Sequence, residues 1–306
     1  MKGGLNMERT YMNFCNYLMT KKSTSANTLS SYQRDLRQFM SHMETLGIRS
    51  WDAVTDSDLK KYFEHLKRLK KSDATISRSM STMRCFFKYL LAKKIITFNP
   101  MVGIKGAKSE AKPPQILSND EVELLLRQPD GQSSKGMRDK AMLEVLYASG
   151  IRVSELLSLK VSDINLDVGY IMMNRYEENE RIIPLYNLAV HSLREYIAKS
   201  RPILVSSNKE NTLFLNTNGQ PMTRQGFWKL VKSYASAAQI DKDITPKILR
   251  HSFATHLLEN GADITMVKDM MGHSSINSTK VYAKLLKNKY LSTYENCHPR
   301  AVKVGE

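Results

Sequence analysis

The sequence predicts a mainly α-helical protein with two domains and one small β-hairpin. Three observations predict this fold class. In the first third of the chain, apolar residues recur at the spacing of a helix, and a polar segment with paired prolines follows. After that segment the helical spacing returns, and it is interrupted by two short apolar runs on either side of a polar turn. With 306 residues, the chain is long enough to build two hydrophobic cores. We therefore expect a helical domain at residues 1–106, a linker at 107–117 and a mixed, mostly helical domain at 118–306.

Three amphipathic segments justify the first domain. In each segment apolar residues recur with a period near 3.6, as on the buried face of a helix. Gly47 is expected to end the first helix, and Thr55 and Asp56 precede the second. The apolar positions are Leu29, Tyr32, Leu36, Phe39, Met40 and Met43 in the first helix, Leu59, Tyr62, Phe63 and Leu66 in the second, and Ile76, Met80, Met83, Phe86, Phe87, Leu90 and Leu91 in the third.

The segment after this domain has no apolar periodicity. Residues 107–114 read Ala-Lys-Ser-Glu-Ala-Lys-Pro-Pro. A polar composition that ends in a proline pair is typical of an interdomain linker. Such a linker would let the two domains close towards each other as a clamp.

Capping residues indicate where the first helices of the second domain begin and end. Ser118 and Glu121 have the spacing of a capping box that opens a helix. A later helix, which contains Met142, is expected to end at Gly150. Arg152 then lies between that helix and the next one.

Two further features position charged residues. Residues 170–173 and 181–185 are apolar runs on either side of a polar turn, which predicts the β-hairpin. The pair Thr245-Pro246 predicts a helix start, with the threonine hydroxyl as N-cap and proline at the first helical position. Lys247 and Arg250 then lie one turn apart on the same face, near the positive end of the helix dipole, where an anion is stabilised.

The chain is strongly basic. Its formal net charge is +16; residues 1–106 hold 19 Lys and Arg against 8 Asp and Glu and so carry +11, which leaves +5 for the other 200 residues. A domain with this charge is expected to bind a polyanion, with binding driven by counterion release. A solvated helix face is the ordinary explanation for any one of these cations, but as a set we interpret them as contacts to DNA phosphates. The candidate DNA-binding residues are Arg34, Arg37, Arg78, Arg84 and Lys88.

The composition argues against membrane and disulfide-rich proteins. No apolar run approaches the ~20 residues of a membrane span, and the N-terminus lacks the apolar region of a signal peptide. A basic surface would also attract a membrane, but the sequence carries no recognisable lipidation signal or aromatic anchor. Cys15, Cys85 and Cys297 are odd in number and match no metal-ligand spacing. We therefore expect a cytoplasmic protein with reduced thiols, no metal and no membrane partner.

Five residues in a fixed order suit phosphodiester chemistry: Arg152, Lys247, Arg250, His273 and Tyr282. A DNA phosphodiester is an anion, and arginine can donate two parallel hydrogen bonds to its non-bridging oxygens. Tyrosine can attack phosphorus and hold it as a covalent ester, while histidine or lysine moves protons or stabilises charge. Because the ester keeps the bond energy, strands can be exchanged without ATP or another cofactor.

At these residues the chain resembles the tyrosine recombinase, or phage integrase, family, and within it the Xer site-specific recombinases. The resemblance rests on residues 249–263 (Leu-Arg-His-Ser-Phe-Ala-Thr-His-Leu-Leu-Glu-Asn-Gly-Ala-Asp), on residues 271–276 (Met-Gly-His-Ser-Ser-Ile) and on the closing His-Pro-Arg-Ala at 298–301. It extends through nearly the whole chain. It implies a SAM-like, core-binding first domain that clamps DNA, followed by a catalytic domain.

The resemblance also implies a mechanism and partners. A covalent 3′-phosphotyrosyl intermediate would form at Tyr282, with Arg152 and Arg250 gripping the phosphate and His273 assisting. The partner would be double-stranded DNA with a specific recombination site. On that DNA the protein would form a homotetramer, or a heterotetramer with a related recombinase, in which the tail at 288–306 docks on a neighbouring subunit.

Two positions depart from the family's pattern. The family usually has histidine three residues before its second arginine, where this chain has Lys247. It usually has lysine on the hairpin, where this chain reads Asn-Arg-Tyr-Glu-Glu-Asn at 174–179; Tyr176 takes the lysine's place and Arg175 is one residue away. The general acid that protonates the leaving 5′ oxygen is therefore open between Lys247, Arg175 and Lys280.

Other interpretations fit parts of the pattern. Tyr282 is followed closely by Tyr290 and Tyr294, and His251 and His256 are expected to be structural because the resemblance gives them no role. Besides a strand-transfer recombinase, the residues fit a type IB topoisomerase-like enzyme that relaxes DNA, or a DNA-binding paralogue with attenuated chemistry, which the missing hairpin lysine favours. The tail favours the recombinase. Resolution of chromosome or plasmid dimers and movement of a mobile element are both compatible with the sequence.

Overall fold

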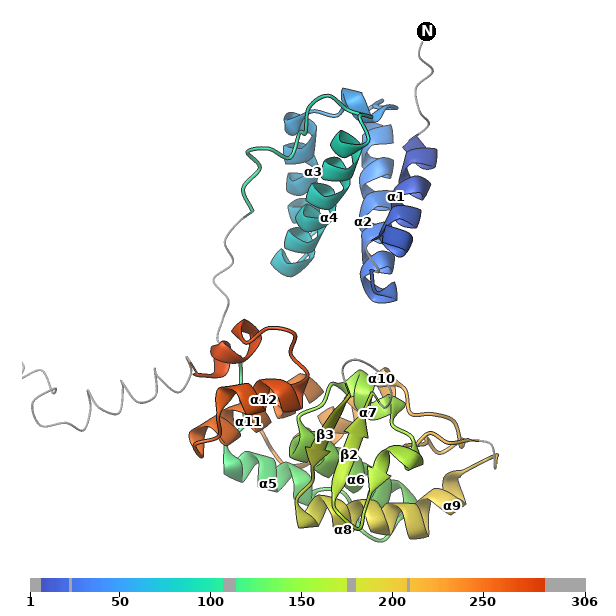
Figure 1. The fold of residues 1–306 in the computed structure, drawn as a ribbon, viewed down its shortest axis with the longest axis vertical. Helices are drawn as coiled ribbons and strands as arrows, with labels where there is room; N and C mark the ends of the chain where they lie inside the picture. The colour runs from blue at the N-terminus through green and yellow to red at the C-terminus, as the bar shows by residue number, and fades with distance from the viewer. Residues whose placement is uncertain (1–6, 22–23, 107–113, 175–179, 208–209, 284–306) are drawn as a thin grey trace, which may run out of the picture. The chain divides into compact units, whose positions relative to one another are not determined.

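The structure, a computed structural model, describes residues 7–21, 24–106, 114–174, 180–207 and 210–283. Its contacts divide the chain into two compact units, Met1–Ala111 and Lys112–Glu306 (Figure 1). The division falls inside the segment expected to be the linker. Among the helices in the described part of the chain, none combines the length and the apolar character needed to cross a membrane.

The first unit is a bundle of helices, as the sequence predicts. Its elements are α1 (Met7–Lys21), α2 (Ala26–Thr45), a 3₁₀ turn (Trp51–Ala53), α3 (Asp56–Arg68) and α4 (Asp73–Ala92). The three predicted amphipathic segments are α2, α3 and α4, and their apolar faces meet in one core, in which the rings of Phe39 and Tyr62 contact edge to face at 4.9 Å. Helix α1 adds Phe14, whose ring packs 5.0 Å from that of Phe86.

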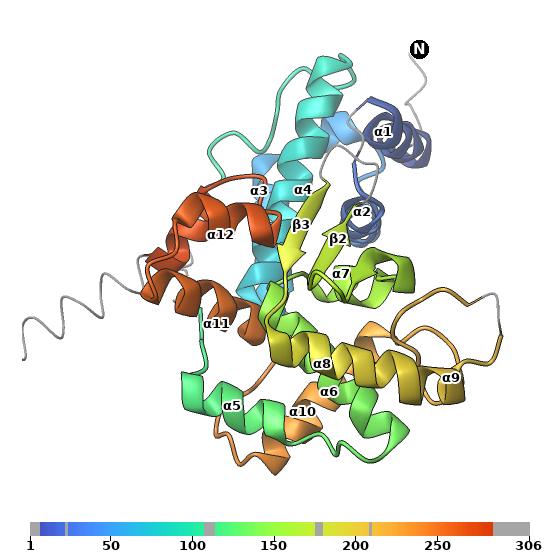
Figure 2. The same ribbon diagram turned by 60° about the horizontal axis from the view of Figure 1, so that its bottom comes forward.

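The second unit combines helices with a small sheet (Figure 2). Its helices are α5 (Asn119–Arg127), α6 (Ser134–Ser149), α7 (Val153–Ser158), α8 (Asn187–Glu195), α9 (Arg201–Leu204), α10 (Arg224–Ala237), α11 (Pro246–Glu259) and α12 (Ile264–Met271). A short 3₁₀ helix (Val161–Asp163) precedes the sheet, and a short π-helix (Tyr196–Ser200) joins α8 to α9. Helix α6 is buried almost all round and packs against α8 and α11, which makes it the centre of this unit.

The predicted hairpin is part of a three-stranded antiparallel sheet. Strands β2 (Tyr170–Met173) and β3 (Arg181–Pro184) pair with Ile171 opposite Ile183, and both of these side chains are buried. The additional strand β1 (Ile164–Asn165) pairs with β2 in the order β1-β2-β3. With two residues, β1 is too short to show the alternation of apolar and polar residues on which a strand prediction depends.

The last residue of the expected linker packs into the second unit. Leu117 is fully buried, and its N–H donates a hydrogen bond to Ser252 Oγ at 2.8 Å. Its carbonyl oxygen lies 2.9 Å from Nε2 of His256. The chain at this point therefore belongs to the core. The capping box that follows, between Ser118 and Glu121, forms as predicted.

Gly150 ends α6 as predicted and brings it against α11. Its backbone adopts the left-handed conformation, with φ of 56°, and a Cβ at this position would lie 2.1 Å from the ring of Phe253 in α11. Pro246 opens α11 at its first position, but the side chain of Thr245 makes no capping hydrogen bond, in contrast to the prediction. Glycine at 150 is therefore required both by the turn and by the close helix contact.

We predict that Gly150→Ala destabilises the second unit by about 2–5 kcal/mol, because it combines left-handed backbone strain with overpacking against the Phe253 ring. The matched control is Gly261→Ala, since Gly261 has φ of +87° but a Cβ added there would meet no atom within 4 Å. The control should lose only about 1–2 kcal/mol. Hydrogen exchange of the α6 and α11 amides would measure both losses. Equal losses in the two variants would contradict the packing argument.

Candidate active site

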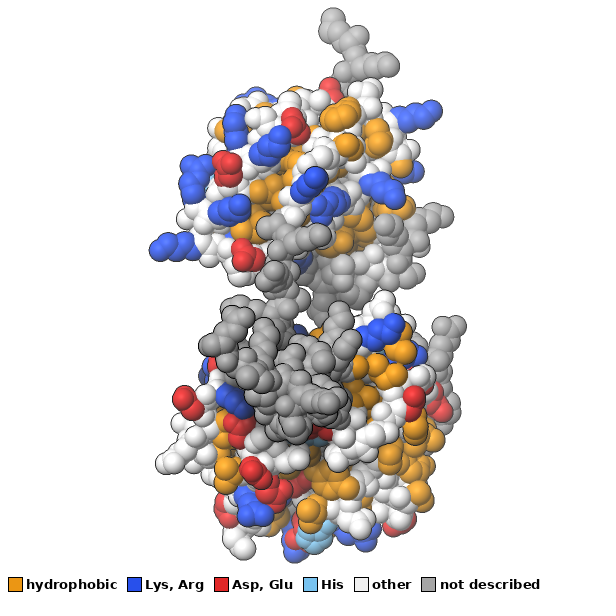
Figure 3. Space-filling model, turned by 90° about the vertical axis from the view of Figure 1, so that its left-hand side faces the viewer, with side chains coloured by type: hydrophobic (Ala, Val, Ile, Leu, Met, Phe, Trp, Pro, Cys, Tyr) orange, Lys and Arg blue, Asp and Glu red, His pale blue; other side chains and the backbone are white. Residues whose placement is uncertain are grey.

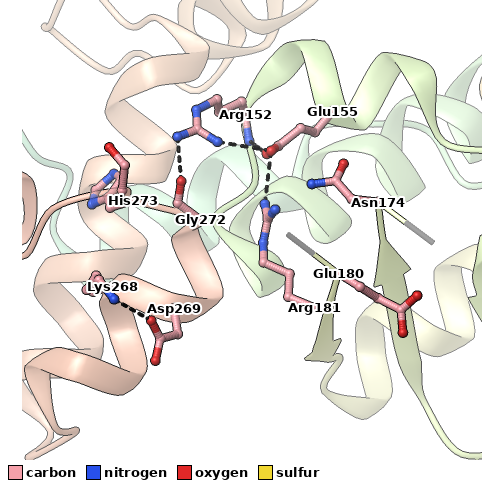
Figure 4. Close-up of a pocket in the computed structure, with 10 residues that line it drawn as sticks. Arg152, Glu155, Asn174, Glu180, Arg181, Lys268, Asp269, Gly272 and His273 are labelled. Carbon is pink, nitrogen blue, oxygen red and sulfur yellow. Dashed lines mark hydrogen bonds and ion pairs between the residues drawn. The ribbon is translucent and has the colours of Figure 1, made fainter. Parts of the chain in front are cut away.

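Arg152 is held at the start of α7 by two anchors (Figure 4). Its guanidinium donates to the carbonyl oxygen of Gly272 at 2.6 Å and to Oε1 of Glu155 at 3.0 Å. Its backbone N–H also donates to Glu155, at 2.7 Å, as in a capping box. The side chain of Arg152 is still 46% exposed, so the guanidinium remains accessible to an anion.

Glu155 and Arg181 complete this cluster, and sequence reasoning assigned no role to either of them. Arg181, the first residue of β3, lies 3.0 Å from Oε1 of Glu155 and donates through Nε to the carbonyl oxygen of Met270 at 3.1 Å. Burial alone would raise the pKa of Glu155, but the N–H of Arg152 and the guanidiniums of Arg181 and Arg152 outweigh it and lower that pKa. Glu155 is therefore an ionised bridge between two arginines.

Arg250 is buried inside the unit. Its guanidinium donates to the carbonyl oxygens of Gly150, at the end of α6, and of Met271, at the end of α12, the latter at 2.8 Å. Burial, and next the charge of Arg152, lower the pKa of Arg250 to about 10. The group stays charged at neutral pH, so the two predicted phosphate-binding arginines lie in one cationic cluster.

His273 follows the turn that ends α12. Gly272 forms this turn with φ of 63°, and a Cβ there would lie 2.8 Å from the guanidinium carbon of Arg181. Nδ1 of His273 lies 2.9 Å from Oγ1 of the buried Thr279. Burial, followed by the charges of the nearby arginines, lowers the pKa of His273 to about 4, so the imidazole is neutral at neutral pH.

Arg152, Arg181 and His273 line one pocket of about 520 Å³. Glu155 and Gly272 contribute to its wall, and Asn174 and Glu180 line it from the ends of β2 and β3 (Figure 4). Lys268, paired with Asp269 at 2.8 Å, also lines it. A concentration of donors around an open hollow suits an anionic ligand such as a phosphodiester.

Tyr282 lines a second pocket, of about 510 Å³, together with Lys247 and His251. Its side chain is 3% exposed, and its hydroxyl lies 2.7 Å from Nδ1 of His251. Burial raises the pKa of Tyr282, and the charge of Arg250 opposes that rise. Arg250 therefore acts electrostatically on both sides of the site, on His273 and on Tyr282.

The predicted residues thus fall into two neighbouring groups. Arg152 and His273 line the first pocket, and Lys247 and Tyr282 line the second. The sequence predicts a structural role for His251 and gives no sign of its contact with the hydroxyl of Tyr282. His256 does have the expected structural contacts, with Tyr147 and Leu117.

Arg175, the possible hairpin contributor, lies outside the described residues. Lys280, the other alternative, is exposed on the helical segment 277–283. In the first unit, the side chains of Arg34, Arg84 and Lys88 are exposed, and their binding to DNA stays a prediction. Arg84 also donates to the carbonyl oxygen of Ile104 at 3.0 Å.

The remaining candidates for DNA binding already have partners within the first unit. Arg78 forms a two-pronged ion pair with the buried Asp35, with N–O distances of 3.1 and 2.7 Å. This pair raises the pKa of Arg78. Arg37 is exposed but lies over the ring of Tyr11, with its guanidinium carbon 5.7 Å from the ring centroid. The ion pair between the Arg78 guanidinium and Asp35 therefore stabilises the helical bundle.

Both units match known protein families. Residues 115–289 match the phage integrase family, and residues 12–94 match the phage integrase N-terminal SAM-like domain. The tyrosine recombinase XerD of Oceanobacillus iheyensis is 43% identical over 297 residues, which cover 96% of this chain and 100% of that protein. The XerD of Listeria monocytogenes serotype 4b is 40% identical over 290 residues, with 94% and 98% of the two chains covered.

Solved structures share the fold at lower identity. The XerH site-specific recombinase bound to a palindromic difH substrate is 21% identical, with a TM-score of 0.76 over 94% of this chain and 84% of that one. The Tn1549 transposon integrase in complex with transposon right end DNA is 22% identical, with a TM-score of 0.77 over 96% and 99%. These structures show the shared fold, and the match to the phage integrase family and the XerD relatives establish that the chain belongs to that family, as a tyrosine site-specific recombinase similar to the Xer enzymes.

Proposed function

We propose that this recombinase cuts duplex DNA by attack of Tyr282 on a phosphodiester and rejoins it to another strand. The observation that supports this most is the gathering of Arg152, Arg250 and His273 beside a tyrosine on which Arg250 acts electrostatically. The hydroxyl oxygen of Tyr282 forms the new bond to phosphorus, and the bond to the 5′ oxygen breaks. Arg152 and Arg250 stabilise the charge that develops on the non-bridging oxygens.

The substrate of this chemistry is double-stranded DNA. The first unit has a surface on which Lys and Arg side chains are spread with few acidic ones among them (Figure 3). Arg34, Arg37, Arg84 and Lys88 are our candidates for phosphate contacts, whereas Arg78 supports the bundle through Asp35. The XerH and Tn1549 recombinases, which share this fold, bind DNA in their solved structures.

The cellular role that we propose is resolution of chromosome or plasmid dimers in the cytoplasm, coupled to chromosome partition and cell division. The support is the similarity to XerD proteins at about 40% identity over nearly the whole chain. Neither the topoisomerase nor the attenuated DNA-binding paralogue is favoured, since these relatives are named as tyrosine recombinases and residues 115–289 of this chain match the phage integrase family.

The decisive test is a covalent adduct on nicked suicide DNA, detected on a denaturing gel in the presence of EDTA. Tyr282→Phe should keep DNA binding and lose the adduct completely, because it removes only the nucleophilic oxygen. Tyr290→Phe and Tyr294→Phe are the matched controls and should form it. Adduct formation by Tyr282→Phe would refute the assignment, and loss of the adduct in one of the controls at the same time would identify the tyrosine that attacks instead. Joining of strands between two duplexes then separates recombination from relaxation.

Lys247 is our candidate for the general acid, although it lines the pocket of Tyr282 and not that of Arg152. The leaving 5′ oxygen needs a proton, because an alkoxide is a poor leaving group. Lys247→Ala should cleave ordinary DNA about 10²-fold more slowly. A substrate with sulfur at the bridging 5′ position should restore most of that rate, since a thiolate leaves without a proton. An equal defect on both substrates would leave Lys247 as a phosphate contact only.

Assembly into a tetramer, with identical or related subunits, is the last part of the proposal. Residues 288–306, which lie outside the described part of the chain, would dock on a neighbouring subunit. A chain truncated after Leu286 should bind one half-site normally and fail to assemble on a full site, which a gel-shift titration would measure. Unchanged assembly by the truncated chain would argue against docking between subunits.

A further inference from the structure

His251 contacts the hydroxyl oxygen of Tyr282, the atom that would attack phosphorus in the proposed reaction. Its Nδ1 lies 2.7 Å from the tyrosine hydroxyl, within normal hydrogen-bond distance, and the two rings are 5.4 Å apart. His251 is half-buried in α11, one turn after Lys247, and both line the pocket that Tyr282 also lines. The contact therefore joins a titratable group to the predicted nucleophile at the edge of a cavity.

The surroundings of His251 keep its imidazole neutral. Lys247 and Arg250 come from its own helix, His273 comes from the turn after α12, and Asp243 lines the same pocket. Burial, and then the charges of Lys247 and Arg250, lower the pKa of His251 to about 4. A neutral imidazole has one nitrogen lone pair that can accept a hydrogen bond, and the phenol is the natural donor.

The other groups around the tyrosine are less suited to take its proton. Arg250 carries its positive charge at neutral pH, because its pKa is about 10, and a cation has no lone pair to offer. His273 is neutral, but its Nδ1 contacts Thr279. Among the described residues, His251 is the titratable side chain in hydrogen-bond contact with the hydroxyl of Tyr282.

We propose that His251 positions the Tyr282 hydroxyl and accepts its proton as the oxygen attacks phosphorus, an inference that rests on Tyr282 being the nucleophile. The proton passes from the phenol to Nδ1, and the freed electron pair forms the O–P bond. The P–O5′ bond breaks, and its electron pair stays on the 5′ oxygen, which takes a proton from the general acid. When the phosphotyrosine is resolved, the imidazolium returns the proton to the phenol oxygen.

A bound phosphate makes this transfer easier. Burial, and then Lys247, Arg250 and His273, disfavour a charged imidazole at His251. A phosphodiester anion beside Arg250 offsets part of that repulsion, and an opposite charge within a few ångströms raises the pKa of a histidine. The basicity of His251 is then coupled to the presence of substrate.

The test compares rates of covalent adduct formation on the suicide substrate for the full chain, His251→Ala and His251→Gln. We expect both variants to be slower by about 10²-fold or more near neutral pH, and we expect the defect to shrink towards high pH, where hydroxide can take the proton. Free imidazole should partly restore His251→Ala. The matched control is His191→Ala, which removes an exposed histidine on α8 and should form adduct at the normal rate without response to imidazole.

The possible outcomes distinguish the role of His251 from the proposed attack of Tyr282 on DNA. The inference would be overturned if both His251 variants formed adduct within about twofold of the rate of the unsubstituted chain, or faster. Such rates would mean that His251 only restrains the side chain of Tyr282 and does not accept its proton. A slow rate that neither imidazole nor high pH changes would also overturn it. DNA binding by gel shift and the thermal midpoint check that each variant is folded. Adduct formation by Tyr282→Phe would instead overturn the nucleophile assignment itself.

Discussion

The site depends on three hydrogen bonds at the carboxyl end of one short helix. The last carbonyl groups of a helix have no partner within it. At the end of α12, the carbonyl oxygens of residues 270–272 accept from Arg181, Arg250 and Arg152 respectively, at 3.1, 2.8 and 2.6 Å. The negative end of the helix dipole favours cations there. Arginines from three separate elements are thereby held together against their mutual repulsion, with Glu155 as the counter-charge between two of them.

This arrangement also fixes the neutral histidines. His273 follows the α12 turn directly, so its ring is placed next to the arginines by the same backbone. His251 shares α11 with Arg250 and Lys247. Burial and the surrounding positive charge lower the pKa of both histidines to about 4. The cluster of cations thus contributes to keeping both imidazoles neutral, and a neutral imidazole has a lone pair that can accept a proton.

Much of this could be predicted from the sequence, because it depends on local patterns. The helices of the first unit, the end of α6 at Gly150 and the capping box at Ser118 follow from periodicity and capping residues close together in the chain. The contact of Arg78 with Asp35 joins residues 43 positions apart, and that of His251 with Tyr282 joins residues 31 apart. Helical spacing shows that Lys247 and His251 share a face of α11, but the partner of that face is set by tertiary packing.

Arg250 acts electrostatically on residues of both pockets, and in the mechanism that we propose it couples substrate binding to activation of Tyr282. Its guanidinium bridges the ends of α6 and α12, while its charge acts on His251, His273 and Tyr282. Burial, and then repulsion from Arg152, lower the pKa of Arg250 to about 10, so the positive charges of the site oppose one another. A phosphodiester relieves that repulsion as it binds. In the mechanism that we propose, the same anion makes a neighbouring imidazole more basic, and His251 becomes better able to deprotonate Tyr282 when the phosphorus atom to be attacked is in place.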